Sequence, residues 1–353
     1  MLKHKQLHSS ISGKLCLCLL SLILVSCKKP PASPPRTIFA LGTVCSLNVY
    51  DEGTDELYGK LITRLNDIER MFDVHSPESE VSHINQNAGI EPVQVSPEVL
   101  AVLDTACYFA EKTGGAFDPS IGPLAALWGI ASDNPRIPSQ AGIDDCLLLV
   151  DYRKIVYDKD ANTVFLPEKG MSLDLGGIAK GFAADELVKI LEKAKVRQAI
   201  IDLGGNIYVY GQKPGNEKWR VGVKDPENPD DSPVVRLEIG SSTVVTSGMY
   251  ERFFEQDGVR YHHILDPKTG YPANSGLLSV TIVSPSSLAA DALSTSAFVL
   301  GKDKALALFA QGFQDAGFSA DMLLIEETHV VTATQNLKSA TVILLSEYQF
   351  AGE

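Results

Sequence analysis

The sequence of 353 residues is short of positive charge. Lys and Arg number 31 against 44 Asp and Glu, which gives a formal net charge of −13 at pH 7. Affinity for nucleic acid depends on Lys and Arg side chains that neutralise phosphates. We therefore expect no nucleic-acid partner, and an anionic substrate would need a local cationic or metal-containing site.

Cysteine is scarce beyond the first 27 residues, where only Cys45, Cys107 and Cys146 occur. Three is an odd number for a disulfide framework, and the spacings fit no metal-binding motif. We expect these cysteines to be small buried side chains.

The sequence also lacks repeats, low-complexity tracts and the two common phosphate-binding fingerprints. No G-x-G-x-x-G is present, and no glycine-rich loop ends in Gly-Lys-Ser/Thr, so neither a Rossmann fingerprint nor a P-loop is predicted. After residue 36 no hydrophobic run is long enough to span a bilayer. The remaining length suits one large domain or two fused lobes.

The N-terminus has the pattern of an export signal. Residues 1–14 carry three lysines and no acid, and residues 15–26 are an apolar run too short for a spanning helix. The following Leu24-Val25-Ser26-Cys27 resembles a bacterial lipobox, and Lys28 to Pro35 is polar and rich in proline. We predict a signal peptide over 1–26, lipidation of Cys27, a tether over 27–36, and an extracytoplasmic protein anchored to a membrane of the bacterial cell envelope. An ordinary signal peptide with a chance cysteine is the alternative.

The pattern of apolar residues predicts an α+β fold for residues 37–350. A strand is expected over 37–50, helices over 54–68 and 96–114, and short antiparallel strands between 154 and 263. A further strand over 277–283, helices over 287–300 and 304–314, and strands near 322–331 and 341–345 complete the chain. This order favours mixed or antiparallel sheets with flanking helices over a doubly wound parallel sheet.

Residues 172–185, SLDLGGIAKGFAAD, are the most informative segment. They are expected to form a strand, a glycine turn at Gly176-Gly177 and the start of a helix. The unpaired N–H groups and positive dipole end of such a helix bind phosphates, with Asp174 and Lys180 beside the ligand. A tight structural connection is the alternative.

The segment Ala289 to Thr295 places Asp291 and Thr295 four residues apart near the start of a predicted helix. That spacing puts a carboxylate and a hydroxyl on one helix face, and both are hard oxygen donors suited to Mg²⁺. Alternatively, Asp291 only favours the helix N-terminus and Thr295 only packs.

Two further segments carry polar residues at predicted turns. In the segment 261–270, His263 stands at a strand end, where a histidine can act as a general base, whereas Asp266 and Gly270 are explained by turn formation. The segment 114–119 ends a helix, and on pattern alone Phe117 and Trp128 are expected in the core.

Taken in order, these motifs resemble the FAD:protein FMN transferase family, the flavin transferases called ApbE or Ftp, from about Phe39 to about Leu345. The matching segments are Leu41-Gly42-Thr43, Ser76 to Glu80 with Ile84-Asn85, Gly115 to Asp118, Gly122-Pro123-Leu124 with Trp128-Gly129, Asp174 to Gly181, Gly204-Gly205-Asn206, His263 to Pro267 with Thr269-Gly270, and Ala290-Asp291-Ala292 with Thr295.

The resemblance implies a T-fold-related, ApbE-like α+β fold that holds FAD in a cleft between two lobes. It implies Mg²⁺-dependent transfer of FMN from FAD to a Thr or Ser hydroxyl of an acceptor protein, with release of AMP. The implied acceptor is a redox protein with an Asp-Gly-x-x-Ser-Gly-Ala-Thr-like motif. The implied FAD-binding residues are Leu41, His75, Ala116, Phe117, Asp118, Asp174, Lys180 and Leu265. The implied metal site comprises the Gly177 carbonyl, Asp291, Ser294 and Thr295, and the catalytic residues are His263 and Asp291.

Two positions depart from the family pattern. His75 replaces a tyrosine that in many members stacks on the flavin, and Leu41 replaces the usual methionine, which conserves volume. Weaker packing at His75 would admit water, so an FAD pyrophosphatase giving FMN and AMP is an alternative function. A non-enzymatic FAD-binding lipoprotein and a purely structural lipoprotein are the others.

Overall fold

The structure is a computed structural model that describes residues 34–213, 215 and 217–352. The predicted signal peptide, the lipidation site Cys27 and most of the tether lie outside these residues. Within them, no helix combines the length and apolar character that crossing a membrane requires. All three cysteines are free, as expected; Cys45 is buried, whereas Cys107 and Cys146 are only partly buried.

A nine-stranded sheet organises the chain, in the order β1-β2-β6-β7-β10-β13-β14-β15-β17. Every neighbouring pair is antiparallel except β15 and β17, which run parallel. The strands are β1 (Arg36–Ala40), β2 (Thr43–Val49), β6 (Gln198–Leu203), β7 (Asn206–Gly211), β10 (Ser242–Gly248), β13 (Leu277–Ser284), β14 (Asp321–Glu326), β15 (Val330–Ala333) and β17 (Gln349–Phe350). The predicted α+β class with antiparallel and mixed sheets is confirmed.

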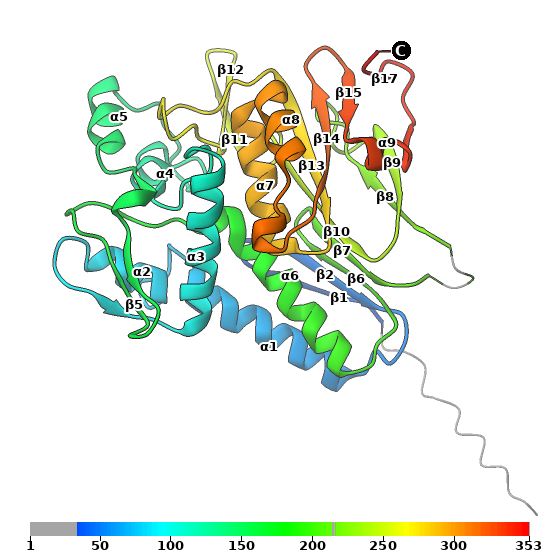
Figure 1. The fold of residues 1–353 in the computed structure, drawn as a ribbon, viewed down its shortest axis with the longest axis horizontal. Coiled ribbons are helices and arrows are strands. Elements are labelled where there is room, and N and C mark those ends of the chain that lie inside the picture. The colour runs from blue at the N-terminus through cyan, green and yellow to red at the C-terminus, as the bar shows by residue number, and fades with distance from the viewer. Residues whose placement is uncertain (1–33, 214, 216, 353) are drawn as a thin grey trace, which may run out of the picture. The chain divides into compact units, whose positions relative to one another are not determined.

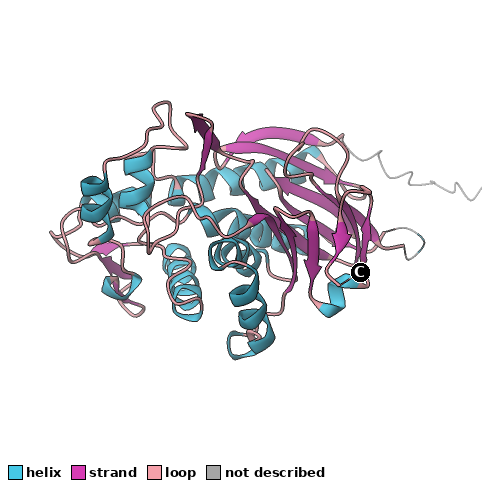
Figure 2. Cartoon of the chain, turned by 90° about the horizontal axis from the view of Figure 1, so that it is seen from above, coloured by secondary structure: helices cyan, strands magenta, loops and turns pink. Residues whose placement is uncertain are grey.

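Helices cover one face of this sheet, with α1, α6 and α7 side by side and α3 beyond them (Figure 1). Seen from above, the strands gather on one side and most helices on the other (Figure 2). The helices are α1 (Asp55–Phe72), α2 (Glu80–Gln86), α3 (Pro97–Lys112), α4 (Gly122–Trp128), α5 (Gln140–Leu147), α6 (Gly176–Lys193), α7 (Ser287–Leu300), α8 (Lys302–Gln311) and α9 (Gln335–Lys338), with 3-10 turns at Tyr152–Lys154 and Gln314–Ala316.

A second, three-stranded sheet packs on the opposite face of the large sheet. It has the order β16-β9-β8, with β8 (Trp219–Val223), β9 (Val235–Ile239) and β16 (Thr341–Ile343). In β10, Val244 contacts this second layer while Val245 contacts the helices, because successive strand residues point to opposite faces. Strands β13 and β14 alternate in the same way, so the middle of the large sheet is buried on both sides.

The remaining strands belong to two small sheets, of which the pair β11 and β12 borders a third apolar cluster around Trp128, while the other packs on the main core. One sheet has the order β3-β5-β4, and the other pairs β11 with β12. Their bounds are β3 (Val93–Gln94), β4 (Val156–Asp158), β5 (Thr163–Phe165), β11 (Phe253–Gln256) and β12 (Val259–His262). Trp128 at the end of α4 is fully buried in the cluster and its indole Nε1 donates to the Gly270 carbonyl at 2.7 Å. The turn after β12 is thereby fixed against α4.

Two local predictions were wrong. Residues 37–50 form a hairpin and not one strand, because Leu41 and Gly42 adopt positive φ angles and turn the chain. Residues 171–175 form no strand, and the two glycines after them are the first residues of α6 and not a turn before it. The side chain of Asn85 replaces a neighbouring strand there, since it bonds both the N–H and the C=O of Leu173.

Candidate active site

A cavity of about 550 Å³ opens where the β1–β2 turn, the start of α6, the middle of α7 and the turn after β12 meet. Its volume lies within the range of small-molecule and cofactor sites. Almost all residues expected at the site line it: Leu41, His75, Ala116, Phe117, Asp118, Asp174, Gly177, Lys180, His263, Leu265, Asp291 and Thr295. Segments separated by up to 250 residues in sequence thus share one cavity.

The N-terminus of α6 opens into this cavity without a side-chain cap from its N-cap residue. Asp174 Oδ1 accepts from the N–H of Gly176 at 2.8 Å, and the N–H groups of Ile178 and Ala179 donate to the Leu175 carbonyl. The N–H of Gly177 has no acceptor among the described residues. Together with the helix dipole, this donor makes the site suitable for an anion such as a phosphate.

Gly177 brings α6 against α7. A Cβ added to Gly177 would lie 3.2 Å from Phe117 Cε2 and 3.6 Å from Thr295 Oγ1. One turn later, a Cβ on Gly181 would lie 2.2 Å from the Ser287 carbonyl oxygen, which no side chain can accommodate. The two glycines therefore allow the close packing that places the start of α6 beside Thr295 and Asp291 of α7.

Asp291 is buried at this helix contact. Its Oδ2 accepts from the N–H of Gly181 at 2.9 Å, and its Oδ1 lies 3.8 Å from Nζ of Lys180. In a regular helix the N–H of Gly181 would donate to the Gly177 carbonyl, so Asp291 competes for that donor. Asp291 stands in the second turn of α7, so the alternative that it supports the helix N-terminus does not apply.

The residues present fit a hard divalent cation. The Thr295 hydroxyl lies near Gly177, and the Asp291 carboxylate bonds the N–H of Gly181 one turn later. Mg²⁺ needs few protein ligands when phosphate and water complete its shell. Among the residues that the structure describes, no cluster of three or more His, Cys, Asp or Glu side chains offers a different kind of metal site.

Ser294 does not line the cavity, contrary to its expected place in the metal shell. Its fully buried hydroxyl donates to the Asp291 carbonyl at 2.9 Å and contacts Ser247 Oγ at 2.8 Å. The residue follows Asp291 by three positions, which directs its hydroxyl back along the helix. Its contacts link α7 to β10 instead.

His263 faces the cavity at the end of β12, while the adjacent His262 is buried and bonds the Ala273 carbonyl. The backbone N–H of His263 donates to the Arg252 carbonyl at 3.0 Å, and its Nδ1 lies 3.2 Å from the same oxygen. Desolvation of the ring by the surrounding protein lowers the pKa of His263 below its ordinary value, and the positive charges of Lys180 and Arg252 lower it further. A neutral ring with its proton on Nδ1 leaves Nε2 as an acceptor towards the cavity.

The Ala116-Phe117-Asp118 segment forms a wall of the cavity, but the Asp118 carboxylate is engaged within the protein. Its Oδ1 accepts from the N–H and hydroxyl of Ser120, and its Oδ2 accepts from the N–H of Tyr152. Burial raises the pKa of Asp118, and these hydrogen bonds oppose the rise. Asp118 shapes the wall, while Phe117 presents an aromatic surface although it is largely buried.

Backbone hydrogen bonds to nearby carboxylates position two further predicted pocket residues, Leu41 and His75. The N–H of Leu41 donates to Glu69 Oε1 at 2.8 Å, and the N–H of His75 donates to Asp73 Oδ1 at 2.9 Å. The His75 side chain is exposed on the cavity lining, whereas Leu265 is buried.

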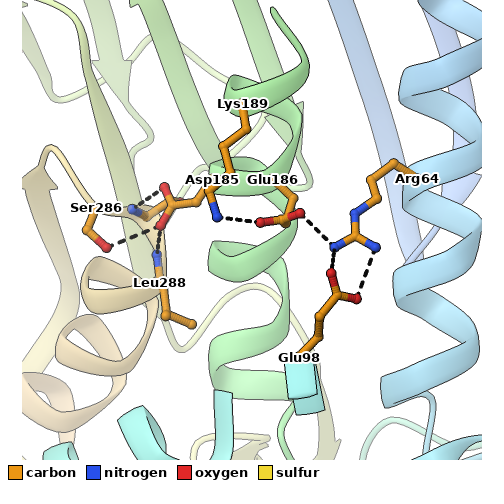
Figure 3. A network of polar contacts seen from close by, with 8 residues as sticks. Arg64, Glu98, Asp185, Glu186, Lys189, Ser286 and Leu288 are labelled. Atoms are coloured by element: carbon orange, nitrogen blue, oxygen red, sulfur yellow. Dashed lines mark hydrogen bonds and ion pairs between the residues drawn. The ribbon is translucent and has the colours of Figure 1, made fainter. Parts of the chain in front are cut away.

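Asp185 is a residue of this region that the sequence analysis missed. Its Oδ1 accepts from the N–H of Ser287 at 2.8 Å, and its Oδ2 accepts from the N–H of Leu288 and the hydroxyl of Ser286 (Figure 3). A residue of α6 thus caps the N-terminus of α7. Gly177, Gly181 and Asp185 are spaced four apart, so they share one helix face, and this spacing was the available signal.

Glu251 and Arg252 are two charged residues of the cavity lining that were not predicted either. Desolvation raises the pKa of Glu251 against the opposing charges of Lys180, Lys224 and Arg252. Arg252 donates from Nη2 to the Gly42 carbonyl at 2.8 Å while its own carbonyl holds His263. Both lie in a stretch predicted as strand, where pattern alone gave no sign of a cavity.

Comparison with known proteins gives consistent similarities. The model of the ApbE family matches residues 41–318. An FAD:protein FMN transferase from Treponema pallidum is 40% identical over 293 residues, covering 78% of this chain and 81% of that protein. One from Klebsiella pneumoniae is 39% identical, covering 77% and 84% respectively. The crystal structure of the ApbE protein from Thermotoga maritima superposes with a TM-score of 0.78 at 36% identity, covering 87% of this chain and 98% of that one.

Proposed function

This chain belongs to the ApbE family and is an FAD:protein FMN transferase, and we propose that it works with Mg²⁺ at the cavity between α6 and α7. The observation that carries the proposal is the convergence of the α6 N-terminus and Lys180 with Asp291 and Thr295. A bound diphosphate needs hydrogen-bond donors and positive charge, and the α6 N-terminus and Lys180 supply these. Asp291 and Thr295 would supply the ligands of a metal ion.

In the proposed complex, residues 37–350 form a T-fold-related domain. The cavity is the cleft between its two lobes, and FAD binds there. The diphosphate lies over the N–H of Gly177 and beside Lys180, and Asp174 holds the first turn of α6. Leu41, His75, Ala116, Phe117 and Leu265 line the flavin and adenine portions. Asp291, Thr295 and the Gly177 carbonyl would hold Mg²⁺, which when bound neutralises charge on the phosphates.

His263 is the proposed general base. Its Nε2 accepts the proton of the acceptor hydroxyl, whose oxygen forms a bond to the FMN phosphorus while the bond from that phosphorus to the bridging oxygen breaks. AMP leaves with the bridging oxygen. The helix N-terminus and Lys180 stabilise the negative charge that develops.

We further propose that residues 1–26 are removed and that Cys27 is lipidated, so that the tether 27–36 holds the enzyme on a membrane of the bacterial cell envelope. The acceptor is then an exported or membrane-bound redox protein with an Asp-Gly-x-x-Ser-Gly-Ala-Thr-like motif. The lysine-rich start and apolar run of the sequence support this proposal.

One assay tests the activity. The protein is incubated with FAD and Mg²⁺, with and without an acceptor that carries the threonine motif, and flavin fluorescence on the denatured acceptor and free AMP are measured. Covalent flavin that requires Mg²⁺ is expected. AMP released equally without acceptor would instead establish a pyrophosphatase, for which the exposed His75 on the cavity lining is the structural argument. Unchanged bound FAD would identify a carrier.

A further inference from the structure

The β1–β2 hairpin fixes which backbone groups of β1 face outwards. Leu41 and Gly42 have φ of 53° and 66° and form a two-residue loop between the paired residues Ala40 and Thr43. In such a hairpin the residue pair that closes the loop, here Ala40 and Thr43, is hydrogen-bonded, and hydrogen-bonded and non-hydrogen-bonded pairs then alternate along the strands. Thr37 and Phe39 therefore direct their N–H and C=O groups away from β2.

This outer edge is open within the part of the chain that the structure describes. Strand β1 ends the nine-stranded sheet, and no hydrogen bond of a described residue reaches the outward groups of Thr37 or Phe39. Proteins usually protect a strand edge with charge, proline or a covering element. Here the strand presents Phe39, 73% exposed, directly opposite Val44, 59% exposed.

The two apolar side chains project from the face that the helices leave uncovered. Ile38, Ala40 and Cys45 pack into the core beneath the helices, so their neighbours Phe39 and Val44 point to the opposite side. We call the outer groups of Thr37 and Phe39, together with the side chains of Phe39 and Val44, the β1 edge.

The β1 edge is continuous with the candidate active site. Phe39 and Gly42 line the cavity. Arg252 donates to the Gly42 carbonyl at 2.8 Å, and the Arg252 carbonyl accepts from His263 at 3.0 Å. A chain bound along β1 would therefore run towards the histidine that takes the hydroxyl proton.

We propose that the β1 edge docks an extended segment of the acceptor polypeptide as an added strand. This rests on the proposed function, in which the second substrate is a protein whose hydroxyl must enter the cavity. Backbone hydrogen bonds to Thr37 and Phe39 give affinity, as in other strand-addition complexes, and Phe39 and Val44 contact alternate apolar side chains. Since backbone pairing reads no sequence, several acceptors can share the site.

Two substitutions outside the cavity lining test the docking. Thr37→Pro removes an outward N–H, which an edge strand tolerates, and Val44→Asp replaces an exposed apolar side chain. Each is expected to raise the acceptor KM about tenfold, the scale of one lost apolar or backbone contact, while kcat at saturating acceptor changes less than about twofold. FAD affinity, measured by quenching of flavin fluorescence, is expected to stay unchanged.

Ile90→Asp is the matched control, because Ile90 is 69% exposed and lies outside the cavity lining. It is expected to leave the acceptor KM unchanged. Unchanged acceptor KM in both test variants, or loss of FAD binding in parallel with acceptor labelling, would overturn the docking assignment. A wild-type dimer in sedimentation that both substitutions dissociate would assign the edge to a second copy instead. A wild-type protein that labels no acceptor would defeat the proposed function itself.

Discussion

The helix pair α1 and α3 differs from the pair α6 and α7 in how α6 is started and in which side chains α7 buries. Thr54 caps α1, since its Oγ1 accepts from the N–H of Leu57, and Ser96 caps α3, since its hydroxyl accepts from the N–H of Val99. Each buries one face. In contrast, α6 has no N-cap side chain, and α7 buries four of its polar side chains, Ser287, Asp291, Ser294 and Ser296.

The difference separates scaffold from site. The side-chain caps of α1 and α3 each bond an N–H of the first turn, whereas the start of α6 keeps the N–H of Gly177 available at the cavity. Helix α7 also receives part of its cap from Asp185 of α6. Polar groups are thus satisfied across the helix contact, and that arrangement positions Asp291 and Thr295.

Removing the carboxylate from α7 is the most severe test of this comparison. Asp291→Ala is expected to reduce FMN transfer about 10³-fold, because a charge-stabilising group at the phosphates is lost. Asp291→Asn is the matched variant, since its amide oxygen can still accept from Gly181. Folding is checked by circular dichroism, and a folded Asp291→Ala protein with full activity would contradict the metal assignment.

The second largest effect is expected at His263. His263→Gln should lower transfer about 10²-fold, the lower range for loss of a general base, with FAD affinity retained. Because the pKa of His263 is lowered, the neutral, active form persists as pH falls, and the acidic limb of kcat/KM should lie below the ordinary histidine pKa of about 6.5. A limb at or above that value, or one that persists in His263→Gln, would exclude this histidine as the base.

Asp185 tests whether the shared cap positions the site. Asp185→Ala should weaken apparent Mg²⁺ affinity about tenfold, as removal of an orienting residue commonly does, and lower stability because three hydrogen bonds to a partly buried carboxylate are lost. A loss of stability with unchanged Mg²⁺ affinity would indicate that Asp185 has only a structural role. Titration of activity with Mg²⁺ and thermal unfolding separate the two.

The smallest effect is expected on the scaffold side. Thr54→Ala removes the cap of α1 and should lower the free energy of unfolding by about 1 kcal/mol. Activity and the Mg²⁺ requirement should stay as in the wild type at a temperature where both proteins are folded. An altered metal requirement would erase the distinction between the two helix pairs.

Sequence pattern predicted α1, α3 and α7 well, since each has apolar residues at helical spacing and a recognisable start. The hairpin at Leu41 was missed because a leucine with positive φ carries no turn signal. Helix α4 was not predicted, because it is short and begins at Gly122-Pro123. Ser294 was expected in the metal shell but lies outside the cavity lining, and spacing along a helix does not tell whether a hydroxyl bonds its own backbone.

By itself, the sequence determined the α+β class, the family and the two segments that hold the charged and hydroxyl groups, because local periodicity and residue chemistry are written into neighbouring positions. Only the tertiary structure decided that Gly177 lies beside Thr295, that Asp185 caps α7, and that Phe39 stands at the cavity beside an open strand edge. Those relations join residues more than 100 positions apart or depend on which face of a sheet is covered, and neither is encoded in local spacing.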